Sequence, residues 1–550
     1  MRTSMAAGVW IFGLVATAWA QAEPIPYDYR NPVIFVQDGG IESGFMDVYL
    51  MALQSAGVID LRGMITSTTW GEENRQPPYS PVPDENLLRE RRELIDKGRR
   101  SGFRNIPDTV AGPTLTLWGR RPASGRIEDT IPFGTPGSWL IVNEARAAST
   151  ARPLVVVMGG DPTAVADAYL LDPTIADRVI VAWQAGYLRA DGTVSADGSF
   201  NMSVDPWASY IVTERLRAVL FVGKGYAEGG IPQTPKSWLS ALPDTEIRQL
   251  MTEAGWPRDG YFWEPLWDID CTPAIALTRS DYVIETRRYS ISYWEPSPWT
   301  AGVYLPVYAP DPSGNLLAVI RASEPVATQE WWARATAPEA WGPSVGQVPY
   351  GSWTVPGAVE AEHFDHGGEG RAYHDATNNF TDASWFNPIR FLEHVDILGS
   401  GSASGGFFVG RAVAGEWLEY GVDVSASGTY TIDVRVASAG PGGAFRIEVD
   451  GVDMTGSIAV PDAGAWTTVS ILGVSLSAGP QTVRLVMESD GPGGEVGAFD
   501  RMTFTLATPA SPGGGPPGGG TSGGNGSGGG CGATGLEAVL LLAAFLYLKR

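Results

Sequence analysis

The sequence predicts two folded domains of different class, an α/β domain followed by an all-β domain. Over residues 25–350, continuous apolar runs such as "PVIFV" (32–36) and "RPLVVVMGG" (152–160) alternate with amphipathic segments. Buried apolar strands between helices are typical of a mostly parallel sheet with helices on both faces. Over residues 354–507, alternating stretches such as "GTYTIDVRVAS" are separated by glycine-rich turns. This second pattern predicts an antiparallel β-sandwich of the jelly-roll type.

The N-terminus has the features of a secretory signal. Arg2 is followed by an almost wholly apolar stretch at 6–17 and by the small-residue sequence "ATAWA", which ends at Ala20. This pattern predicts a signal peptide over residues 1–22, with a buried structural helix as the alternative. We therefore expect the protein to be secreted.

The C-terminal end has two parts. Residues 508–530 are almost entirely Gly, Pro, Ser and Thr, a composition that predicts a flexible linker. Residues 531–550 combine Cys531, a short apolar run and a final Lys-Arg pair, and they resemble the C-terminal sorting tags of Gram-negative surface proteins. A retained membrane-associated helix is the alternative, since the run is shorter than the roughly 20 residues that span a bilayer. We expect a cell-surface or outer-envelope location, with this tail as the only membrane contact.

Composition limits the chemistry of the first domain. The formal net charge is −23 and no basic block is present, which argues against nucleic-acid binding. The two cysteines, Cys271 and Cys531, lie in different parts of the chain and are not expected to pair. All four histidines lie between residues 363 and 394. Histidine-dependent triads and histidine-ligated zinc are therefore excluded before residue 363, and carboxylates and amides must act there.

The second domain resembles the family-six carbohydrate-binding modules. The resemblance rests on "VEAEHFDHGGEGRAYHDATNN", "FVGRAVAGEWLEYGVDV", "FRIEVDG" and "GAFDRMTF". It implies a structural calcium ion between the first and last strands, bound by Glu360, Glu362 and Asp500. Oxygen ligands suit Ca²⁺, and strand alternation places the two glutamates on one face. The alternative is a pair of surface glutamates.

The same resemblance implies a polysaccharide or oligosaccharide ligand. In such modules aromatic rings stack on the sugar and amides bind its hydroxyl groups. The aromatic residues in a loop context are Tyr373 and Trp466, with Asn378 and Asn379 as polar partners. Many members have an asparagine two positions before the last calcium carboxylate, where this chain has Ala498. The cleft at the loop end is therefore expected to lack one polar contact.

The first domain resembles inosine–uridine nucleoside hydrolases over roughly residues 30–285. The matching stretches are "VIFVQDGGIES", "VVVMGGDPTAVADAYLLDPTIADRVIV" and "SFNMSVDPWASYIV". A secreted sugar-hydrolase-like branch of the same fold fits the "DGxIE" turn better. The resemblance implies a calcium ion that holds sugar hydroxyls and lowers the pKa of a water molecule, and an aspartate that activates this water.

The sequence departs from the family motif at several of its acidic positions. Val36 replaces the first aspartate, Asp38 is kept, and the paired acids become Glu42 and Ser43. Asn201 of the "AEFN"-like segment is also kept. The calcium cage of the family therefore cannot form unchanged.

Two interpretations of these acids remain. In the first, the site is rebuilt from Asp38 and Glu42 as catalytic groups, Asp38 and Asp270 as metal ligands, and Asp161 with Asn201 as substrate contacts. In the second, Asp38 is a turn residue, Glu42 a helix first-turn acid and Asp161 a helix cap. Asp47, on the following helix, is expected at the surface.

The domain combination favours carbohydrate chemistry. A tethered binding module raises the local concentration of its glycan around the attached domain. We therefore expect hydrolysis of glycosidic bonds, N-glycosidic bonds included, in a polysaccharide-associated substrate. The alternatives are a non-catalytic glycan-binding surface protein with a degenerate hydrolase domain, and a true N-ribosyl hydrolase, which Val36 and Ser43 disfavour. No pattern indicates an oligomeric interface.

Overall fold

The computed structural model describes residues 22–507 except 38–45, 68–83, 224–229, 254, 257–260, 263–264, 268, 299, 378–388 and 391. The described residues up to Ala507 belong to one compact unit. The expected signal peptide, linker and C-terminal tail lie outside the described residues. Within the described residues, no helix is long and apolar enough to cross a membrane.

The first domain is built on a ten-stranded sheet whose first half is parallel. These strands are short and almost wholly buried because their Val, Ile and Leu runs face apolar side chains on both sides. In sheet order they are β3 (Thr109–Ala111), β2 (Asp60–Thr66), β1 (Pro32–Gln37), β4 (Leu154–Met158) and β5 (Val179–Leu188).

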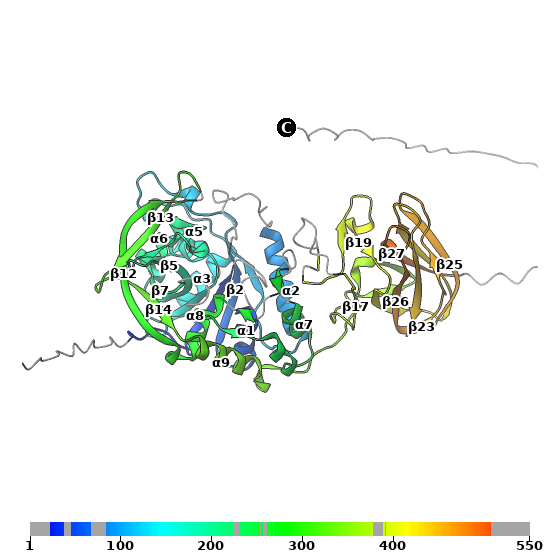
Figure 1. Ribbon diagram of the computed structural model, residues 1–550, viewed down its shortest axis with the longest axis horizontal. Coiled ribbons are helices and arrows are strands. Elements are labelled where there is room, and N and C mark those ends of the chain that lie inside the picture. Colours follow the sequence, from blue (N-terminus) through cyan, green and yellow to red (C-terminus); the bar gives the residue numbers. More distant parts are fainter. Residues whose placement is uncertain are drawn as a thin grey trace, which may run out of the picture. The chain divides into compact units, whose positions relative to one another are not determined.

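The second half of the sheet closes into a ring. After β5 the order is β6 (Val194–Ser195), β13 (Tyr304–Pro310), β12 (Val283–Pro296), β14 (Leu316–Ala322) and β7 (Arg217–Gly223), and β7 pairs with β5 as well. β12 is the long curved strand at the outer side of this ring (Figure 1). The sequence analysis did not anticipate this antiparallel part, because β12 carries many charged and polar residues and lacks a continuous apolar run.

Helices cover both faces of the parallel strands. Val33 and Phe35 of β1 pack with α1 (Met46–Ser55), α8 (Thr272–Thr278) and α9 (Glu324–Ala335), together with parts of α2 (Asp84–Arg100) and α7 (Glu246–Glu253). Ile34 and Val36 face the other side, where α3 (Pro136–Ala147), α4 (Thr163–Leu171) and α6 (Pro206–Arg215) pack. The predicted fold class is confirmed for this domain.

Asp47 is a correction to the sequence analysis. It lies on α1 but is 2% exposed, and it forms an ion pair with Arg91 of α2. The expected surface position was wrong because a helix between the sheet and a second helix has two covered sides. The guanidinium of Arg91 makes this burial tolerable, since a buried carboxylate needs a partner.

The second domain consists of two sheets that share one core. One sheet contains β15 (Trp353–Val355), β20 (Trp417–Val424), β26 (Gly479–Ser489), β22 (Ala444–Val449) and β23 (Val452–Asp453), with β17 (Tyr373–His374) and β24 (Ile458–Ala459) beside them. The other contains β18 (Ile397–Gly399), β19 (Phe407–Ala412), β27 (Gly497–Leu506), β21 (Gly428–Ala437), β25 (Thr467–Leu476) and β16 (Gly357–Glu360). All pairings are antiparallel except that of β15 with β20, so the predicted β-sandwich is confirmed.

Candidate functional site

The carboxyl ends of β1, β2 and β4 meet at one edge of the parallel sheet. Gln37 ends β1, and its carbonyl accepts a hydrogen bond of 2.9 Å from the backbone of Ser67, just after β2. The N–H of Gly159, just after β4, donates to the carbonyl of Val36 over 3.1 Å. Ligands of open α/β sheets bind at this edge. The segment 38–45, which contains Asp38 and Glu42, follows Gln37 directly and lies outside the described residues.

Asp270 reaches this edge from a distant part of the chain. It lies in a short 3₁₀ turn, Ile269–Cys271, just before α8, and it is 5% exposed. The amide of Gln37 donates a hydrogen bond of 2.8 Å to its carboxylate. Gly159 makes this approach possible, because a Cβ atom there would lie 2.1 Å from Gln37 Oε1 and 2.5 Å from Asp270 Cβ. The structure thus places Asp270 beside Gln37, the last residue of β1.

Asp161 is fully buried in the turn that joins β4 to α4. Its Oδ1 accepts hydrogen bonds from the backbone N–H of Thr163, at 3.0 Å, and from the Thr163 hydroxyl. Its Oδ2 has no hydrogen-bond partner among the described residues. Burial raises the pKa of Asp161 to about 6, although Thr163 and the nearby hydroxyl of Ser67 favour the charged form. The carboxyl group anchors the start of α4 through Oδ1.

Asp205 is a buried acid that the sequence analysis did not single out. Its carboxylate accepts hydrogen bonds from Leu117 N at 2.5 Å, Thr163 Oγ1 at 2.8 Å and Ala208 N at 3.1 Å. Burial raises its pKa to about 7, and the nearby charge of Asp161 adds to the rise. An Asp-Pro pair at a helix start is the sequence signal for such a cap. Asp205 caps α6 and joins it to α4.

Asn201 is held against the end of β5. It lies in the short helix α5 (Phe200–Ser203), and its amide donates to the carbonyl oxygen of Gln184 at 2.9 Å and to the side-chain oxygen of Gln184 at 3.0 Å. Both N–H groups of the amide are thereby engaged, so only its oxygen can accept from a ligand. Ser199, where the family has a glutamate, instead accepts a hydrogen bond of 2.8 Å from the N–H of Gly186.

The chemistry available at this edge is acid–base chemistry. Asp161 titrates near pH 6, close to the range where a carboxyl group can exchange protons at neutral pH. Within the described residues, no group of three or more His, Cys, Asp and Glu side chains is arranged to hold a metal ion. Gln37 Oε1 and Asp161 Oδ2 are buried oxygens that lack a partner among the same residues.

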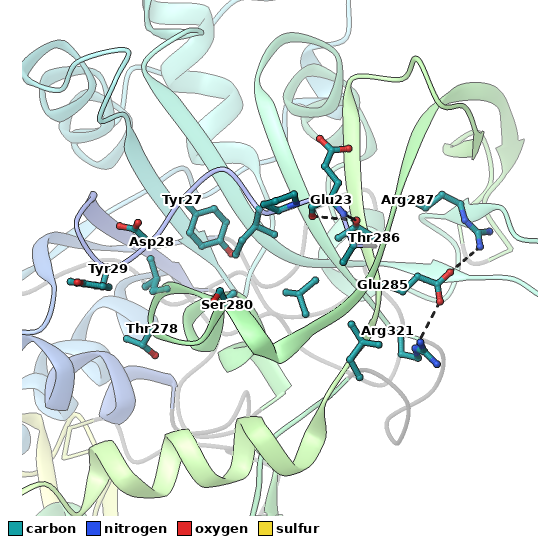
Figure 2. A pocket seen from close by; sticks show the side chains of 17 residues that line it. Glu23, Tyr27, Asp28, Tyr29, Thr278, Ser280, Glu285, Thr286, Arg287 and Arg321 are labelled. Carbon is teal, nitrogen blue, oxygen red and sulfur yellow. Dashed lines mark hydrogen bonds and ion pairs between the residues drawn. The ribbon is translucent and has the colours of Figure 1, made fainter. Parts of the chain in front are cut away.

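A separate groove of about 1480 Å³ lies near the start of β1. Figure 2 shows its lining residues, which come from the N-terminal segment, the end of α8 and β12. Glu285 pairs with Arg287 and with Arg321 at its rim, and Thr286 bonds the backbone of Glu23. These charges are satisfied by one another and do not converge on the groove. It is therefore a weaker site candidate than the strand-end cluster.

The three carboxylates expected to bind calcium lie near one another in the β-sandwich, but they are not grouped as ligands of one ion. The Oε1 atom of Glu360 accepts from the Ser404 hydroxyl at 2.9 Å, and Asp500 accepts from the Ser404 N–H at 2.7 Å and pairs with Arg435. The second oxygen of Glu360 and that of Glu362 are buried without a partner among the described residues. Burial raises the pKa of Glu362 to about 8, and the charges of Glu360 and Asp500 add to this.

The two aromatic residues expected to bind sugar lie in different environments. Trp466 is half-buried, and its indole N–H donates to the Ser402 hydroxyl at 3.2 Å. The edge-on ring of Phe408 and the guanidinium of Arg435 pack around it. Tyr373 is 2% exposed within the sandwich core, so its ring cannot stack on a sugar, and its expected binding role does not fit the structure. Asn378 and Asn379 lie outside the described residues.

A comparison with known protein families finds a match within the second domain. Residues 392–506 match the family 6 carbohydrate-binding module. This match indicates carbohydrate binding. The N-terminal part of the module's β-sandwich, with Glu360, Glu362 and Tyr373, precedes the matched residues.

Comparison with solved structures returns proteins similar to each domain. A plant nucleoside hydrolase is 16% identical, with 56% of this chain and 99% of that chain covered and a TM-score of 0.38. An inosine–guanosine nucleoside hydrolase is 12% identical, with 55% and 98% covered and a TM-score of 0.40. A β-1,3-glucan-binding family 6 module from Bacillus halodurans is 23% identical, with 28% and 98% covered and a TM-score of 0.21. A comparison with curated protein sequences finds no match.

Proposed function

We propose that this protein is a secreted, surface-associated hydrolase of glycosidic bonds that a carbohydrate-binding module holds on its substrate. The position of Asp270 is the observation that supports the proposed hydrolytic activity. Its carboxylate bonds to Gln37 at the end of β1, next to the turn with Asp38 and Glu42, although it is 233 residues away along the chain. Asp161, at the end of the neighbouring strand β4, adds a further buried carboxyl group.

The residues at this edge of the sheet have different roles in the proposed hydrolysis. Asp38 or Glu42 accepts a proton from water as the water oxygen bonds to the anomeric carbon. The bond between that carbon and the leaving group breaks, and solvent water donates a proton to the departing atom. Asp161 Oδ2 and the side-chain oxygen of Asn201 accept hydrogen bonds from sugar hydroxyls, since neither is a donor in the observed network. Gln37 orients Asp270 through its amide.

The donor chemistry of this edge fits a calcium ion. The available groups are oxygens, and Gln37 Oε1 is a buried oxygen without a partner among the described residues. Asp38 and Asp270 would be its carboxylate ligands. Bound there, calcium would hold sugar hydroxyls and lower the pKa of a water molecule.

The donor chemistry of Glu360, Glu362 and Asp500 supports the proposal of a calcium ion in the β-sandwich, although their side chains are not grouped as a metal site. Glu360 and Glu362 each present one buried oxygen without a partner among the described residues, and Asp500 lies close enough for its charge to raise their pKa values. These groups belong to the first and last strands or to the turn directly after the first strand. An ion bound by them would therefore tie the ends of the module together.

Secretion and surface location are proposed from the sequence alone. The N-terminal pattern supports export, and the glycine-rich stretch followed by Cys531 and a short apolar run supports retention at the envelope. A glycan-binding module suits this location because polysaccharides are abundant outside the cell.

The direct test is hydrolysis by the full chain. A panel of p-nitrophenyl glycosides and free nucleosides would be offered to the wild type, to Asp270→Asn and Glu42→Gln, and to the control Asp177→Asn, which alters an exposed aspartate. We expect the first two variants to lose about 100-fold or more in rate, with the control unchanged. Activity that is equal in all four proteins, or absent from the wild type, would show that the first domain is not catalytic.

A non-catalytic glycan-binding protein is the second candidate. The specific observation in its favour is the role of Asp161, whose Oδ1 accepts from the N–H and hydroxyl of Thr163 at the start of α4. A hydrolase domain that has lost its activity would keep Asp161 for this contact, because the contact stabilises the start of α4. Glycan binding without hydrolysis, with Glu362→Gln removing the one calcium ion per chain, would establish this candidate.

A further inference from the structure

Arg121 of the first domain is surrounded by three tryptophan rings. It directly follows the short 3₁₀ helix Trp118–Arg120, and its guanidinium carbon lies 5.1 Å from the ring centroids of Trp118, Trp207 and Trp294 alike. A guanidinium within about 6 Å of an indole ring is attracted to the face of that ring. Arg121 is nevertheless exposed, so the rings hold the cation without closing it off from solvent.

The three rings are fixed by packed parts of the fold. Trp207 is buried in α6, and Trp294 belongs to β12. Trp118 follows Leu117, whose backbone N–H donates a hydrogen bond of 2.5 Å to Asp205, the cap of α6. The position of the guanidinium is therefore set before any ligand binds, which lowers the entropic cost of binding.

Arg121 has no anionic partner in the described part of the chain. Its guanidinium makes neither a hydrogen bond nor an ion pair there, although the chain has 61 acidic and 38 basic residues. The acids that follow it along the chain are paired elsewhere, Glu128 with Arg215 at 2.8 Å and Asp129 with Arg126 at 3.8 Å. All five N–H donors of the Arg121 guanidinium are therefore available to a ligand.

Arg120 adds a second positive charge next to Arg121. Its guanidinium donates to the carbonyl oxygens of Ile131 and Pro132, at 3.2 and 2.8 Å, and it pairs with no carboxylate among the described residues. Two neighbouring cations without a paired acid attract an anion to this part of the surface.

The adjacent rings indicate what the anion is attached to. Trp118 and Trp294 are half-buried, and their ring centroids lie 6.4 Å apart, so both retain exposed ring area beside the cation. Indole rings pack against the apolar faces of sugars. The planar guanidinium matches two oxygens of a carboxylate or a sulfate group. A sugar that carries such a group next to its ring can use both kinds of contact.

We propose that Arg121 and the indoles around it form a subsite of the first domain for acidic saccharides. The guanidinium binds the carboxylate of a uronic acid or the oxygens of a sulfate ester, and Trp118 and Trp294 contact the sugar ring. The inference rests on the proposed action of the protein on glycans, and it narrows the glycan to an acidic one. The subsite lies outside residues 392–506, which match the carbohydrate-binding module.

Hydrogen bonds connect this subsite to the candidate active site. Asp205 accepts from the Leu117 N–H at 2.5 Å and from the Thr163 hydroxyl at 2.8 Å, and the same hydroxyl also bonds Asp161. The segment that carries Arg121 is thereby held close to the turn after β4. An acidic polymer bound at Arg121 would lie near the strand ends where hydrolysis is proposed.

The test is isothermal titration of the full chain with an oligogalacturonate. Its fully methyl-esterified form is the uncharged comparison ligand, and a sulfated carrageenan oligosaccharide tests the sulfate ester as the anion. Arg121→Ala removes the guanidinium, and Arg121→Lys keeps the charge without the planar fork. Arg126→Ala is the matched control, since it removes an exposed arginine that is close in the chain and paired with Asp129.

We expect Arg121→Ala to weaken binding of the acidic ligand about tenfold or more, because it removes hydrogen bonds between charged groups. Arg121→Lys should lie between Arg121→Ala and the wild type, and Arg126→Ala should bind like the wild type. The methyl ester should bind equally to all four proteins. Dependence on Arg121 for the sulfated ligand alone would support the subsite and identify a sulfate ester as its anion.

Three results would overturn the subsite. Equal losses in Arg121→Ala and Arg126→Ala would reflect general charge, and a lower melting temperature of Arg121→Ala with unchanged binding would show a packing role alone. Failure of every acidic ligand to bind the wild type is the third. Hydrolysis of p-nitrophenyl glycosides tests the proposed function separately: binding that depends on Arg121 in a protein without hydrolytic activity would support the subsite and refute the hydrolase.

Discussion

The buried carboxyl group of Asp205 should make the first domain less stable as the pH rises. Its pKa is raised from 3.8 to about 7 in the folded protein, chiefly by burial. Because the folded state binds the proton more tightly than the unfolded state, the stabilisation is complete below pH 4. It is lost as the pH rises from about 4 to 7 and stays lost above that. The difference between the two pKa values corresponds to about 4 kcal/mol, with the opposing effect of the three hydrogen bonds already included.

Asp205→Asn isolates this contribution. The asparagine does not titrate, so the fall in unfolding free energy between pH 4 and 7 should be about 3–4 kcal/mol smaller than in the wild type. The substitution also has a constant cost, because an amide N–H₂ replaces the oxygen that accepts from Leu117 and Thr163. Each bond lost costs about 1–3 kcal/mol.

The measurement is urea unfolding at a series of pH values, followed by hydrogen exchange of peptides that cover Pro206–Arg215. These peptides report directly on α6, the helix that Asp205 caps. Asp177→Asn serves as the control, since its carboxylate is exposed. Identical pH dependence in the wild type and Asp205→Asn would refute the reasoning, because the carboxylate would then be as well solvated by its three donors as by water.

Three further predictions concern packing and binding. Gly159→Ala should abolish hydrolysis and lower the melting temperature, since the new Cβ would overlap Asp270; a functional, equally stable variant would contradict the close approach. Trp183→Phe should destabilise the first domain by about 1–3 kcal/mol in urea unfolding, because the Gly160 carbonyl loses its 2.8 Å bond from the indole; no change would show that another donor replaces it. Trp466→Ala should weaken oligosaccharide binding at the loop end about tenfold, which affinity electrophoresis would reveal, and unchanged mobility would exclude it as a contact.

The strands β1 and β4 were predictable because they are almost wholly buried. Their apolar runs are unambiguous since both faces of the sheet are covered there. β12 was not predicted from the sequence. Most of its side chains are half-buried or exposed, so its sequence shows neither a continuous apolar run nor a regular alternation of apolar and polar residues. Its place in the sheet depends on partners far along the chain, which local pattern does not reveal.

The candidate site was predictable in part for a similar reason. Asp161 could be placed at a strand end because it follows a recognisable apolar run, and the proximity of Asp270 rests on the resemblance to a known family. The burial of Tyr373 was not predictable, since "RAYHDATNN" has the composition of a loop while the ring points into the core beside Phe364. Asp205 was missed because its partners, Leu117 and Thr163, come from two other segments.

The pairing of β7 with both β5 and β14 has a consequence for aggregation. An unpaired strand edge offers backbone groups to other chains and invites aggregation. The ring gives β7 a partner on each side, and β3, which ends the ten-stranded sheet, is only three residues long. A polysaccharide surface would concentrate many copies of this protein side by side. The closed sheet would allow that crowding without offering neighbours a strand to extend.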